Sequence, residues 1–417
     1  QREPFVSYSA CGLPYFIAGQ VPEHAALVAR TPEQFARTGI TIKTEHEVLE
    51  IDHPRQQLKA LDQRSGATVT DSYDHLVFAT GAKVFCPPVS GIDLNGVFQL
   101  RSLVDGLAIK RYIADHRPKN AVIIGAGYIG VEMAETFLQL GMNVTILDMA
   151  PRPLSTLDPE MAAMVAKALE DAGVTLALDT KLEGLEGDGS GRVSCVGSGG
   201  ATMAGDLVLL ATGVAPNSEL AKAIGVGLGP RGAICADQLG KTNLERVYAA
   251  GDCATVHHRV LDMNVYMPLG TTANKQGRAL GMTLAGVEHP FKGVVGSSVT
   301  KFNDLHVAAT GLTEEAAGKA GFAVKAARIE STDHAGYYPG ARPIHVKLVA
   351  EAGSGRLLGG QIIGYEEVAK RADILAVAVQ QRLTVDEFAW SDLTYAPPFS
   401  SVWDPVLVAA QVLAGER

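Results

Sequence analysis

One cysteine near the start of the chain stands in a setting suited to redox chemistry. Cys11 lies in VSYSACGLPYFIAG (6–19), and the position five residues later is Phe16 rather than a second cysteine. No disulfide can therefore form within this motif. A single cysteine must cycle with an external sulfur, as a mixed disulfide, or with oxygen, as a sulfenic acid.

The residues around Cys11 favour the thiolate form of its side chain. Pro14 suits the first turn of a helix, which would place Cys11 at or just before a helix N-terminus. Free N–H groups and the helix dipole stabilise a thiolate there. Ser7 and Ser9 can donate hydrogen bonds to the sulfur or to a substrate. The alternative is a buried, unreactive thiol, the usual state of a free cysteine. We assign that state to the remaining four, Cys86, Cys195, Cys235 and Cys253.

A glycine-rich segment predicts a binding site for the pyrophosphate of a dinucleotide. AVIIGAGYIG (121–130) reads as a buried strand that runs into the glycines of a G-x-G-x-x-G turn, and a helix and a second strand follow. Such a turn lets the backbone approach a pyrophosphate, whose charge the helix N-terminus favours. The second strand ends at Asp148, which can accept hydrogen bonds from ribose hydroxyls but would repel a 2′-phosphate. NADH is therefore favoured over NADPH, and the alternative is a glycine turn that binds nothing.

Two other strand ends carry small and polar residues suited to ligand contact. HLVFATGAK (75–83) and DLVLLATGVAPN (206–217) both read as a strand followed by Ala-Thr-Gly. This internal repeat, with Gly81 and Gly213 at the turns, suggests two related nucleotide-binding domains, and the alternative is chance similarity. Asp252 follows the strand VYAA, where it can bind a ligand hydroxyl or cap a following helix.

Composition narrows the class of protein. The chain has 417 residues, which predicts two or three domains, and it carries a net charge of −9. An acidic chain argues against a nucleic-acid or anionic-membrane partner, since both need a basic face. No run reaches the ~18 apolar residues of a membrane span. Five scattered cysteines do not form a disulfide framework and fit the cytoplasm.

The last third of the chain has a different pattern. From about Ser297, four β-rich segments are followed by the amphipathic YEEVAKRADILAVAVQQRL, which predicts a separate α+β domain. Upstream, CATVHH (253–258) contains Cys253, His257 and His258, whose side chains could bind a metal if this segment were a helix. We expect no metal there, because a fourth ligand is missing nearby.

These segments, in this order, resemble the flavin- and NAD(P)H-dependent pyridine nucleotide–disulfide oxidoreductases. They are SYSACGLPYFIAG, the Ala-Thr-Gly pair, GAGYIGVEMAE, AAGDCA and PLGTTANKQGR. The resemblance covers essentially the whole chain and is to the single-cysteine branch, which includes coenzyme A disulfide reductase, CoA-persulfide or polysulfide reductase, NADH oxidase and NADH peroxidase. It implies an α/β fold of two Rossmann-like domains, a C-terminal α+β dimerisation domain and a homodimer.

The resemblance also implies domain boundaries. An FAD domain in two pieces, 1–104 and 237–295, would enclose an NADH domain at 105–236, and 296–417 would dimerise. In this family the FAD domain opens with a strand, glycine turn, helix and strand, which take roughly 30 residues. Only ten residues precede Cys11. We therefore expect this opening unit, with its clamp for the FAD pyrophosphate, to be missing from these 417 residues.

Cofactor contacts follow from the same resemblance. Asp252 would hold the flavin ribityl chain, and Ile129 and Glu132 would face the nicotinamide. The other residues implied for FAD are Val48, Thr80, Gly81, Leu269, Gly270 and Thr271. Those for NADH are Gly125, Gly127, Tyr128, Gly130, Asp148 and Gly213.

Two late segments bear on the substrate. HAGYYPGA (334–341) and DLTYAPPFSSVWDP (392–405) resemble the CoA-disulfide and persulfide reductases, in which a tyrosine from each segment reaches the partner subunit's cysteine. Tyr395 is one match, and Tyr338 or its neighbour Tyr337 is the other. A phenol can donate a proton to a leaving thiolate or a peroxidic oxygen. The alternative is an interface aromatic with a satisfied hydroxyl.

The resulting prediction is an enzyme that passes electrons from NADH through FAD to Cys11 and on to a low-molecular-weight disulfide or persulfide. CoA disulfide or CoA persulfide is the expected acceptor. One alternative is an NADH oxidase or peroxidase that uses a Cys11 sulfenic acid. Another, of a different class, is a non-catalytic nucleotide-binding fragment.

Overall fold

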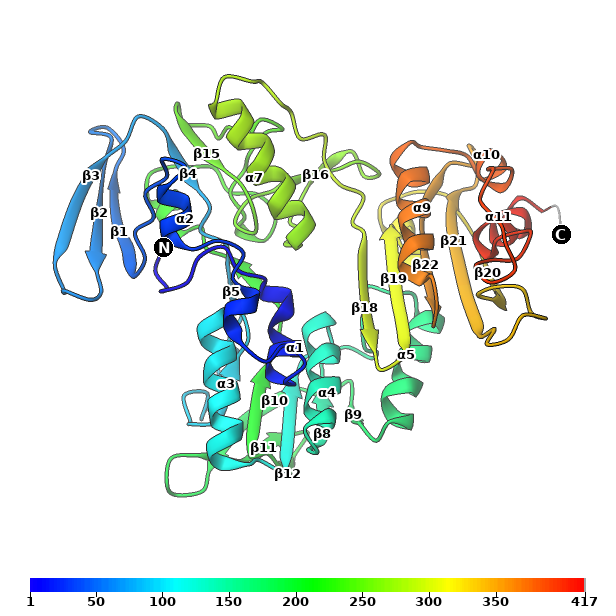
Figure 1. The fold of residues 1–417 in the computed structure, drawn as a ribbon, viewed down its shortest axis with the longest axis horizontal. Coiled ribbons are helices and arrows are strands. Elements are labelled where there is room, and N and C mark those ends of the chain that lie inside the picture. Colours follow the sequence, from blue (N-terminus) through cyan, green and yellow to red (C-terminus); the bar gives the residue numbers. More distant parts are fainter. Residues whose placement is uncertain (416–417) are drawn as a thin grey trace.

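A five-stranded parallel sheet forms the centre of the structure, a computed structural model that describes residues 1–415 (Figure 1). Its strands run in the order β6-β13-β7-β8-β9. The inner strands are nearly all buried apolar residues because helices pack against the sheet. The bounds are β6 (Val97–Gln99), β7 (Asn120–Ile124), β8 (Asn143–Leu147), β9 (Thr175–Ala177), β13 (Leu207–Leu210), α3 (Leu103–His116), α4 (Tyr128–Gln139) and α5 (Pro159–Asp171).

The strand, glycine turn, helix and strand predicted between residues 120 and 148 are β7, α4 and β8, so this prediction is confirmed. β7 and β8 pair in parallel, as a strand–helix–strand crossover requires. α4 begins immediately after the glycine turn. It ends before Gly141, whose positive φ of 80° lets the chain turn sharply into β8.

Two smaller sheets flank the central one. An antiparallel meander has the order β10-β11-β12, and β5 pairs antiparallel with β14. The β5–β14 pair ties two stretches that lie more than a hundred residues apart in the chain. The bounds are β5 (Ala82–Val84), β10 (Leu182–Gly187), β11 (Val193–Ser198), β12 (Ala201–Ala204) and β14 (Val214–Pro216).

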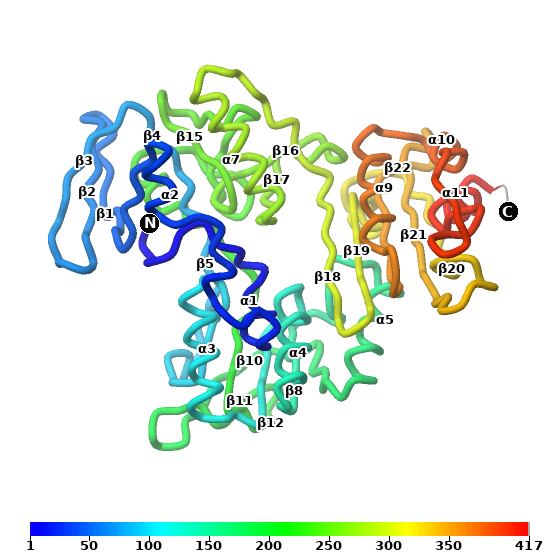
Figure 2. The backbone as a smooth tube through the Cα atoms, in the orientation of Figure 1, coloured from blue at the N-terminus to red at the C-terminus, as the bar shows by residue number. Residues whose placement is uncertain are grey.

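The first hundred residues and the segment after β14 come together in space, although the central sheet separates them in sequence (Figure 2). The parallel pairing of β4 with β15 joins them, and β1-β2-β3 form an antiparallel meander beside this pair. α7 packs nearby. The strands are β1 (His46–Asp52), β2 (Gln57–Asp62), β3 (Thr68–Ser72), β4 (Leu76–Phe78), β15 (Val247–Ala249), β16 (Val256–His258) and β17 (Met263–Val265). The helices are η1 (Ala10–Gly12), α1 (Leu13–Ile17), η2 (His24–Leu27), α2 (Pro32–Ala36), α6 (Glu219–Ala223), η3 (Pro230–Gly232) and α7 (Gly270–Leu284).

The C-terminal part is the α+β unit that the sequence predicts. Its antiparallel sheet has the order β18-β19-β22-β21-β20, with α9 and α11 packed against it. The β18–β19 hairpin extends towards α4 of the central part (Figure 1). The bounds are β18 (Ser298–Phe302), β19 (Leu305–Gly311), α8 (Glu314–Lys319), β20 (Val324–Thr332), β21 (Pro343–Glu351), β22 (Leu357–Gly364), α9 (Val368–Gln380), α10 (Val385–Ala389) and α11 (Pro405–Ala414).

One local prediction is wrong. No helix follows Asp252, because the chain turns at 251–254 and then enters the strand β16. The pattern CATVHH therefore lies in a turn and a strand rather than on a helix. Across residues 1–415 there is also no helix with the length and apolar character needed to cross a membrane.

Candidate active site

Cys11 lies in η1, directly before α1, and its side chain is exposed. Pro14 stands in the first turn of α1, as the sequence predicts. This short helix is fixed at both ends: the Thr136 hydroxyl of α4 donates to the Pro14 carbonyl at 3.3 Å, and Lys110 of α3 donates to the Phe16 carbonyl at 2.9 Å. The helix that follows Cys11 is therefore anchored to α3 and α4, and the Cys11 side chain is exposed to solvent.

The two serines before Cys11 do not contact its sulfur. Their loop is held by backbone hydrogen bonds, in which Ser9 N donates to the Leu27 carbonyl and Ala29 N donates to the Ser7 carbonyl. Within residues 1–415, no hydrogen bond joins either serine hydroxyl to Cys11. The predicted contact with the thiol is therefore not formed, and contact with a substrate stays a prediction.

The environment of Cys11 includes an acid from α4. Burial raises the pKa of the Tyr15 phenol, and the negative charges of Glu132 and the Cys11 thiolate raise it further. Burial likewise raises the pKa of Glu132, while a 3.1 Å hydrogen bond from the Thr300 hydroxyl opposes that shift. The cysteine helix, α4 and β18 therefore share one electrostatic environment. The sequence reasoning identified Glu132 but missed Tyr15 and Thr300.

The glycine turn before α4 has the close contacts that a dinucleotide site requires. Gly125 has a φ of +114°, and a Cβ on it would lie 2.3 Å from the Ala211 carbonyl oxygen. A Cβ on Gly130 would lie 2.0 Å from the Gly125 carbonyl oxygen. Gly127 instead faces open space. The first and third glycines thus permit the packing, and the middle one leaves room for a ligand.

Asp148 reaches back to this turn. One of its carboxylate oxygens accepts a hydrogen bond from Ala126 N at 2.6 Å, and the other accepts from Ala150 N at 2.8 Å. The structure therefore brings together the acid and the glycine turn that the sequence separates by more than twenty residues.

A cleft of about 830 Å³ lies between the central part, the segment 258–269 and the C-terminal sheet. Tyr128, at the start of α4, and Leu269, before α7, both line it. The Tyr128 hydroxyl lies 2.7 Å from Ser298 Oγ on the far wall. Residues predicted for NADH and for the flavin thus meet in one cleft.

Asp252 has a feature that calls for a ligand. One of its carboxylate oxygens contacts Arg101 at 2.5 Å, but the other is buried with no partner in the described part of the chain. The nearby Tyr266 hydroxyl is likewise buried and unpartnered, and burial, followed by the charge of Asp252, raises the pKa of Tyr266 to about 12. Buried polar atoms are normally hydrogen-bonded, so this region is built for additional donors and acceptors. The sequence reasoning missed Arg101 and Tyr266.

The two Ala-Thr-Gly turns lie side by side. Asn217 N donates to the Gly81 carbonyl at 3.0 Å, and Phe85 N donates to the Gly213 carbonyl at 3.0 Å. The Thr80 hydroxyl donates to the Asn217 carbonyl. Of the other predicted flavin residues, Gly270 and Thr271 open α7, while Val48 lies in the β1–β2 ladder opposite Ala60.

The structure distinguishes between the two candidate tyrosines of the 334–341 segment. The Tyr395 side chain lies close to Tyr337 and is the main cause that raises the pKa of the Tyr337 phenol. Tyr338 instead packs edge-on against the His334 ring, with centroids 5.7 Å apart. Tyr337 and Tyr395 are both exposed. The segments that carry them, between β20 and β21 and between α10 and α11, belong to the C-terminal part, well away from α1 of the same chain (Figure 1).

His258 of the CATVHH pattern is buried inside the fold. Burial lowers the pKa of His258 to about 4, and the neighbouring His257 adds to the effect. The neutral His258 ring accepts hydrogen bonds from Val260 N and Leu261 N. Residues 1–415 contain no cluster of three or more potential metal ligands.

Two family models match the chain. Residues 3–277 match the pyridine nucleotide-disulphide oxidoreductase model, and residues 297–406 match the dimerisation domain of the same proteins. The chain belongs to the pyridine nucleotide-disulphide oxidoreductases. The predicted resemblance is therefore confirmed, as are the fold class and the dependence on FAD and a nicotinamide nucleotide.

Relatives that are named for different activities are similarly close to this chain in sequence. A protein named NADH oxidase from Methanocaldococcus jannaschii is 37% identical over 98% of this chain and 91% of its own. A CoA-dependent NAD(P)H sulfur oxidoreductase from Pyrococcus furiosus is 39% identical over 98% and 91% of the two chains. The structure of an NAD-dependent persulfide reductase from A. fulgidus has a TM-score of 0.96, with 38% identity, and the match covers 100% of this chain and 77% of that one.

Two features of this pyridine nucleotide-disulphide oxidoreductase fit a bound FAD: unpartnered buried polar groups and an uncapped helix start. The unpartnered Asp252 oxygen and Tyr266 hydroxyl are buried groups that a polyhydroxyl chain would satisfy. At α7, the first N–H groups have no side-chain cap and are free to meet a ligand. The domain boundaries and the individual contacts stay predictions.

Proposed function

We propose that this enzyme uses NADH and FAD to reduce a CoA-type disulfide or persulfide through Cys11. The observation that carries the proposal is that Cys11 is an exposed free thiol directly before α1, a helix that hydrogen bonds anchor to α3 and α4. A small external sulfur can reach it, and no second cysteine of the motif competes. The names of the relatives, which include a CoA-dependent sulfur oxidoreductase and a persulfide reductase, support a CoA-type acceptor.

In the proposed reaction, the Cys11 thiolate attacks one sulfur of the external disulfide. A Cys11 mixed disulfide forms, the external S–S bond breaks, and the other sulfur leaves as a thiolate. A tyrosine hydroxyl, from Tyr395 or Tyr337 of the second subunit, donates a proton to that leaving thiolate. Two electrons from NADH then return the mixed disulfide to the Cys11 thiolate and a second thiol.

The remaining residues bind and orient. When bound, FAD supplies the redox chemistry between NADH and sulfur. Asp252 would accept hydrogen bonds from its ribityl hydroxyls, and the start of α7 would face the isoalloxazine. The open Gly127 position admits the NADH pyrophosphate, while the Asp148 carboxylate favours NADH over NADPH.

The dimerisation domain supports a homodimer. We also propose a cytoplasmic location, since the five cysteines, all within the described residues, are free thiols of the kind that a reducing compartment preserves.

The test is anaerobic turnover of the FAD-loaded enzyme with NADH and CoA disulfide. The proposal predicts two CoA thiols for each NADH consumed, and loss of that activity in Cys11→Ser. Cys86→Ser is the matched control, because Cys86, which was predicted from the sequence to be buried, is instead an exposed free thiol. NADH consumption that needs oxygen and releases no thiol would indicate the NADH oxidase alternative. Nucleotide binding without a flavin spectrum would indicate the non-catalytic alternative.

A further inference from the structure

A buried polar network in the C-terminal part lies beneath the two tyrosine segments. Its centre is Arg371 on α9, which is 2% exposed. Asp333 and Asp404, its nearest acidic neighbours, are 1% and 7% exposed. The proposed reaction has no use for any of these three residues.

One side of the Arg371 guanidinium holds the segment that carries Tyr337. Its Nη2 donates to the Asp333 carbonyl at 2.6 Å. The Asp333 carboxylate accepts from Arg342 N at 3.0 Å, at the far end of the same loop, and lies 2.8 Å from His334 Nδ1. Arg371 and Asp333 therefore fix both ends of the 333–342 loop.

The other side of the guanidinium holds the segment that carries Tyr395. Arg371 Nε donates to both carboxylate oxygens of Asp404, at 3.1 and 3.0 Å. Asp404 also accepts from the Ser400 hydroxyl at 2.8 Å and from Val406 N at the start of α11. A single backbone bond, from Ala335 N to the Pro397 carbonyl at 3.2 Å, joins the two segments directly.

Stability alone is a poor reason for this arrangement. A buried ion pair often contributes little net stability compared with a packed apolar core. Arg371 Nη1 is moreover buried without a partner among residues 1–415. Geometry is a better reason, because a planar guanidinium can hold two segments at once, whereas a lysine ammonium is a single point charge.

We propose that Arg371 is a positioning residue that registers the 333–342 loop against the 392–404 segment and so keeps Tyr337 paired with Tyr395. The inference rests on the proposed function for its consequence, which is that the tyrosine pair meets the leaving thiolate in a fixed geometry. Arg371 itself touches neither substrate nor cofactor.

The test is Arg371→Lys in the FAD-loaded dimer, with Lys370→Gln as the matched control. Lys370 is the adjacent residue on α9, but its side chain is exposed and, within residues 1–415, pairs only with Asp373. We expect Arg371→Lys to lower CoA-disulfide turnover roughly 10- to 100-fold, as misplacement of a catalytic group does. The rate at which NADH reduces the bound flavin should stay unchanged.

A second measurement separates positioning from general damage. In a Tyr337→Phe background, the addition of Arg371→Lys should lower turnover further by less than about twofold, because the effects of two residues that act through one contact are not additive. Fully additive losses, or equal losses in flavin reduction and turnover, would overturn the proposal.

Tyrosine NMR gives a readout independent of activity. With ¹³C-labelled tyrosine, and Tyr337→Phe to assign the signal, Tyr337 should titrate at lower pH in Arg371→Lys, because the Tyr395 side chain that raises its pKa is no longer held beside it. An unchanged Tyr337 titration contradicts the proposal even if the enzyme reduces no disulfide. If Arg371→Lys fails to fold, Ser400→Ala removes one bond to Asp404 without unpairing a charge. It should then shift Tyr337 in the same direction, and no shift would overturn the proposal.

Discussion

Glu132 and Glu135 lie one turn apart on α4 and face the C-terminal hairpin in different states. Burial raises the pKa of Glu132, whose carboxylate accepts a hydrogen bond from the Thr300 hydroxyl. Glu135 instead contacts Lys301 Nζ at 2.5 Å and accepts from Asn303 N. Ionisation of Glu132 is therefore unfavourable in the folded state, whereas Glu135 takes part in an ion pair.

This difference predicts opposite effects of two similar substitutions. A raised pKa in the folded state means that ionised Glu132 lowers stability as pH rises, so Glu132→Gln should raise stability at pH 7 on the order of 1 kcal/mol and leave it unchanged near pH 4. Glu135→Gln should lower stability at pH 7 by about 1–3 kcal/mol, because it leaves Lys301 without its partner. Denaturant unfolding at both pH values checks this, and a destabilised Glu132→Gln at pH 7 would contradict it.

His258 makes stability depend on pH in the acid range. Its pKa is lowered from 6.5 to about 4. Between pH 6.5 and pH 4, therefore, His258 is protonated in the unfolded chain but neutral in the folded chain. The contribution is present above pH 6.5 and is lost as pH falls towards 4. His258→Asn should therefore reduce the stability difference between pH 7 and pH 5 by about 2 kcal/mol.

Denaturant midpoints at the two pH values measure this effect. His289→Asn, at an exposed histidine, controls for the loss of one titratable side chain. An undiminished pH difference in His258→Asn would refute the assignment.

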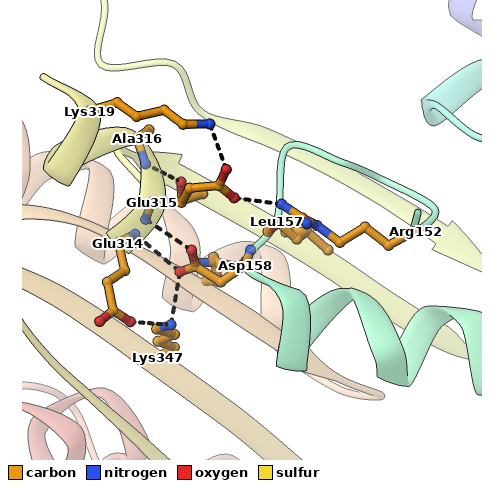
Figure 3. Close-up of polar contacts among 10 residues, drawn as sticks. Arg152, Leu157, Asp158, Glu314, Glu315, Ala316, Lys319 and Lys347 are labelled. Atoms are coloured by element: carbon orange, nitrogen blue, oxygen red, sulfur yellow. Dashed lines mark hydrogen bonds and ion pairs between the residues drawn. The ribbon is translucent and has the colours of Figure 1, made fainter. Parts of the chain in front are cut away.

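At the level of helices and strands, Asp158 joins the central part to the C-terminal sheet (Figure 3). It precedes α5, and its carboxylate accepts from Glu314 N and Glu315 N at the start of α8. Lys347 of β21, 3% exposed, lies 3.0 Å from Asp158 and 2.7 Å from Glu314. Burial lowers the pKa of Lys347, but its acidic partners, which include Glu160, outweigh that effect and raise it.

Lys347→Met should destabilise the protein by about 3–5 kcal/mol, because it leaves the buried Asp158 carboxylate without its cation. Lys319→Met is the matched control: Lys319 contacts Glu315 at the exposed rim of the same cluster, where an ion pair contributes about 0–1 kcal/mol. Denaturant unfolding of both variants decides this, and equal losses would mean that the buried cluster is not a specific anchor.

The whole molecule divides the proposed chemistry between two subunits. Cys11, directly before α1, is exposed, and so are Tyr337 and Tyr395. The segments that carry the two tyrosines, between β20 and β21 and between α10 and α11, lie away from the same chain's α1 (Figure 1). A two-fold dimer is the arrangement that can place one chain's tyrosines at the other chain's cysteine.

Mixed dimers test this arrangement. Co-expression of Cys11→Ser with a Tyr337→Phe/Tyr395→Phe chain should restore about a quarter of wild-type turnover, since half of the dimers are mixed and each has one intact site. Each variant alone should be nearly inactive. If the tyrosines acted within their own chain, the mixture would show no recovery.

Local patterns were sufficient for much of the fold. The 120–148 unit, the C-terminal strands and α9 follow from hydrophobic periodicity and turn residues, which act over a few positions. The prediction of a helix after Asp252 was wrong because local pattern is ambiguous there: an Asp that follows a strand suits a helix cap and a turn equally well. Family resemblance then supplied roles that no local pattern contains.

Contacts between distant segments were decided by tertiary packing alone. The sequence named Asp252, Tyr395 and two neighbouring tyrosines, but it could not pair Asp252 with Arg101, choose Tyr337 as the partner of Tyr395, or find Arg371 beneath them. These partners are separated by tens to more than a hundred residues, and what brings them together is the burial of shared apolar faces. Residue type and short-range spacing determine which chemistry is available, whereas the packing of sheets and helices determines which groups meet.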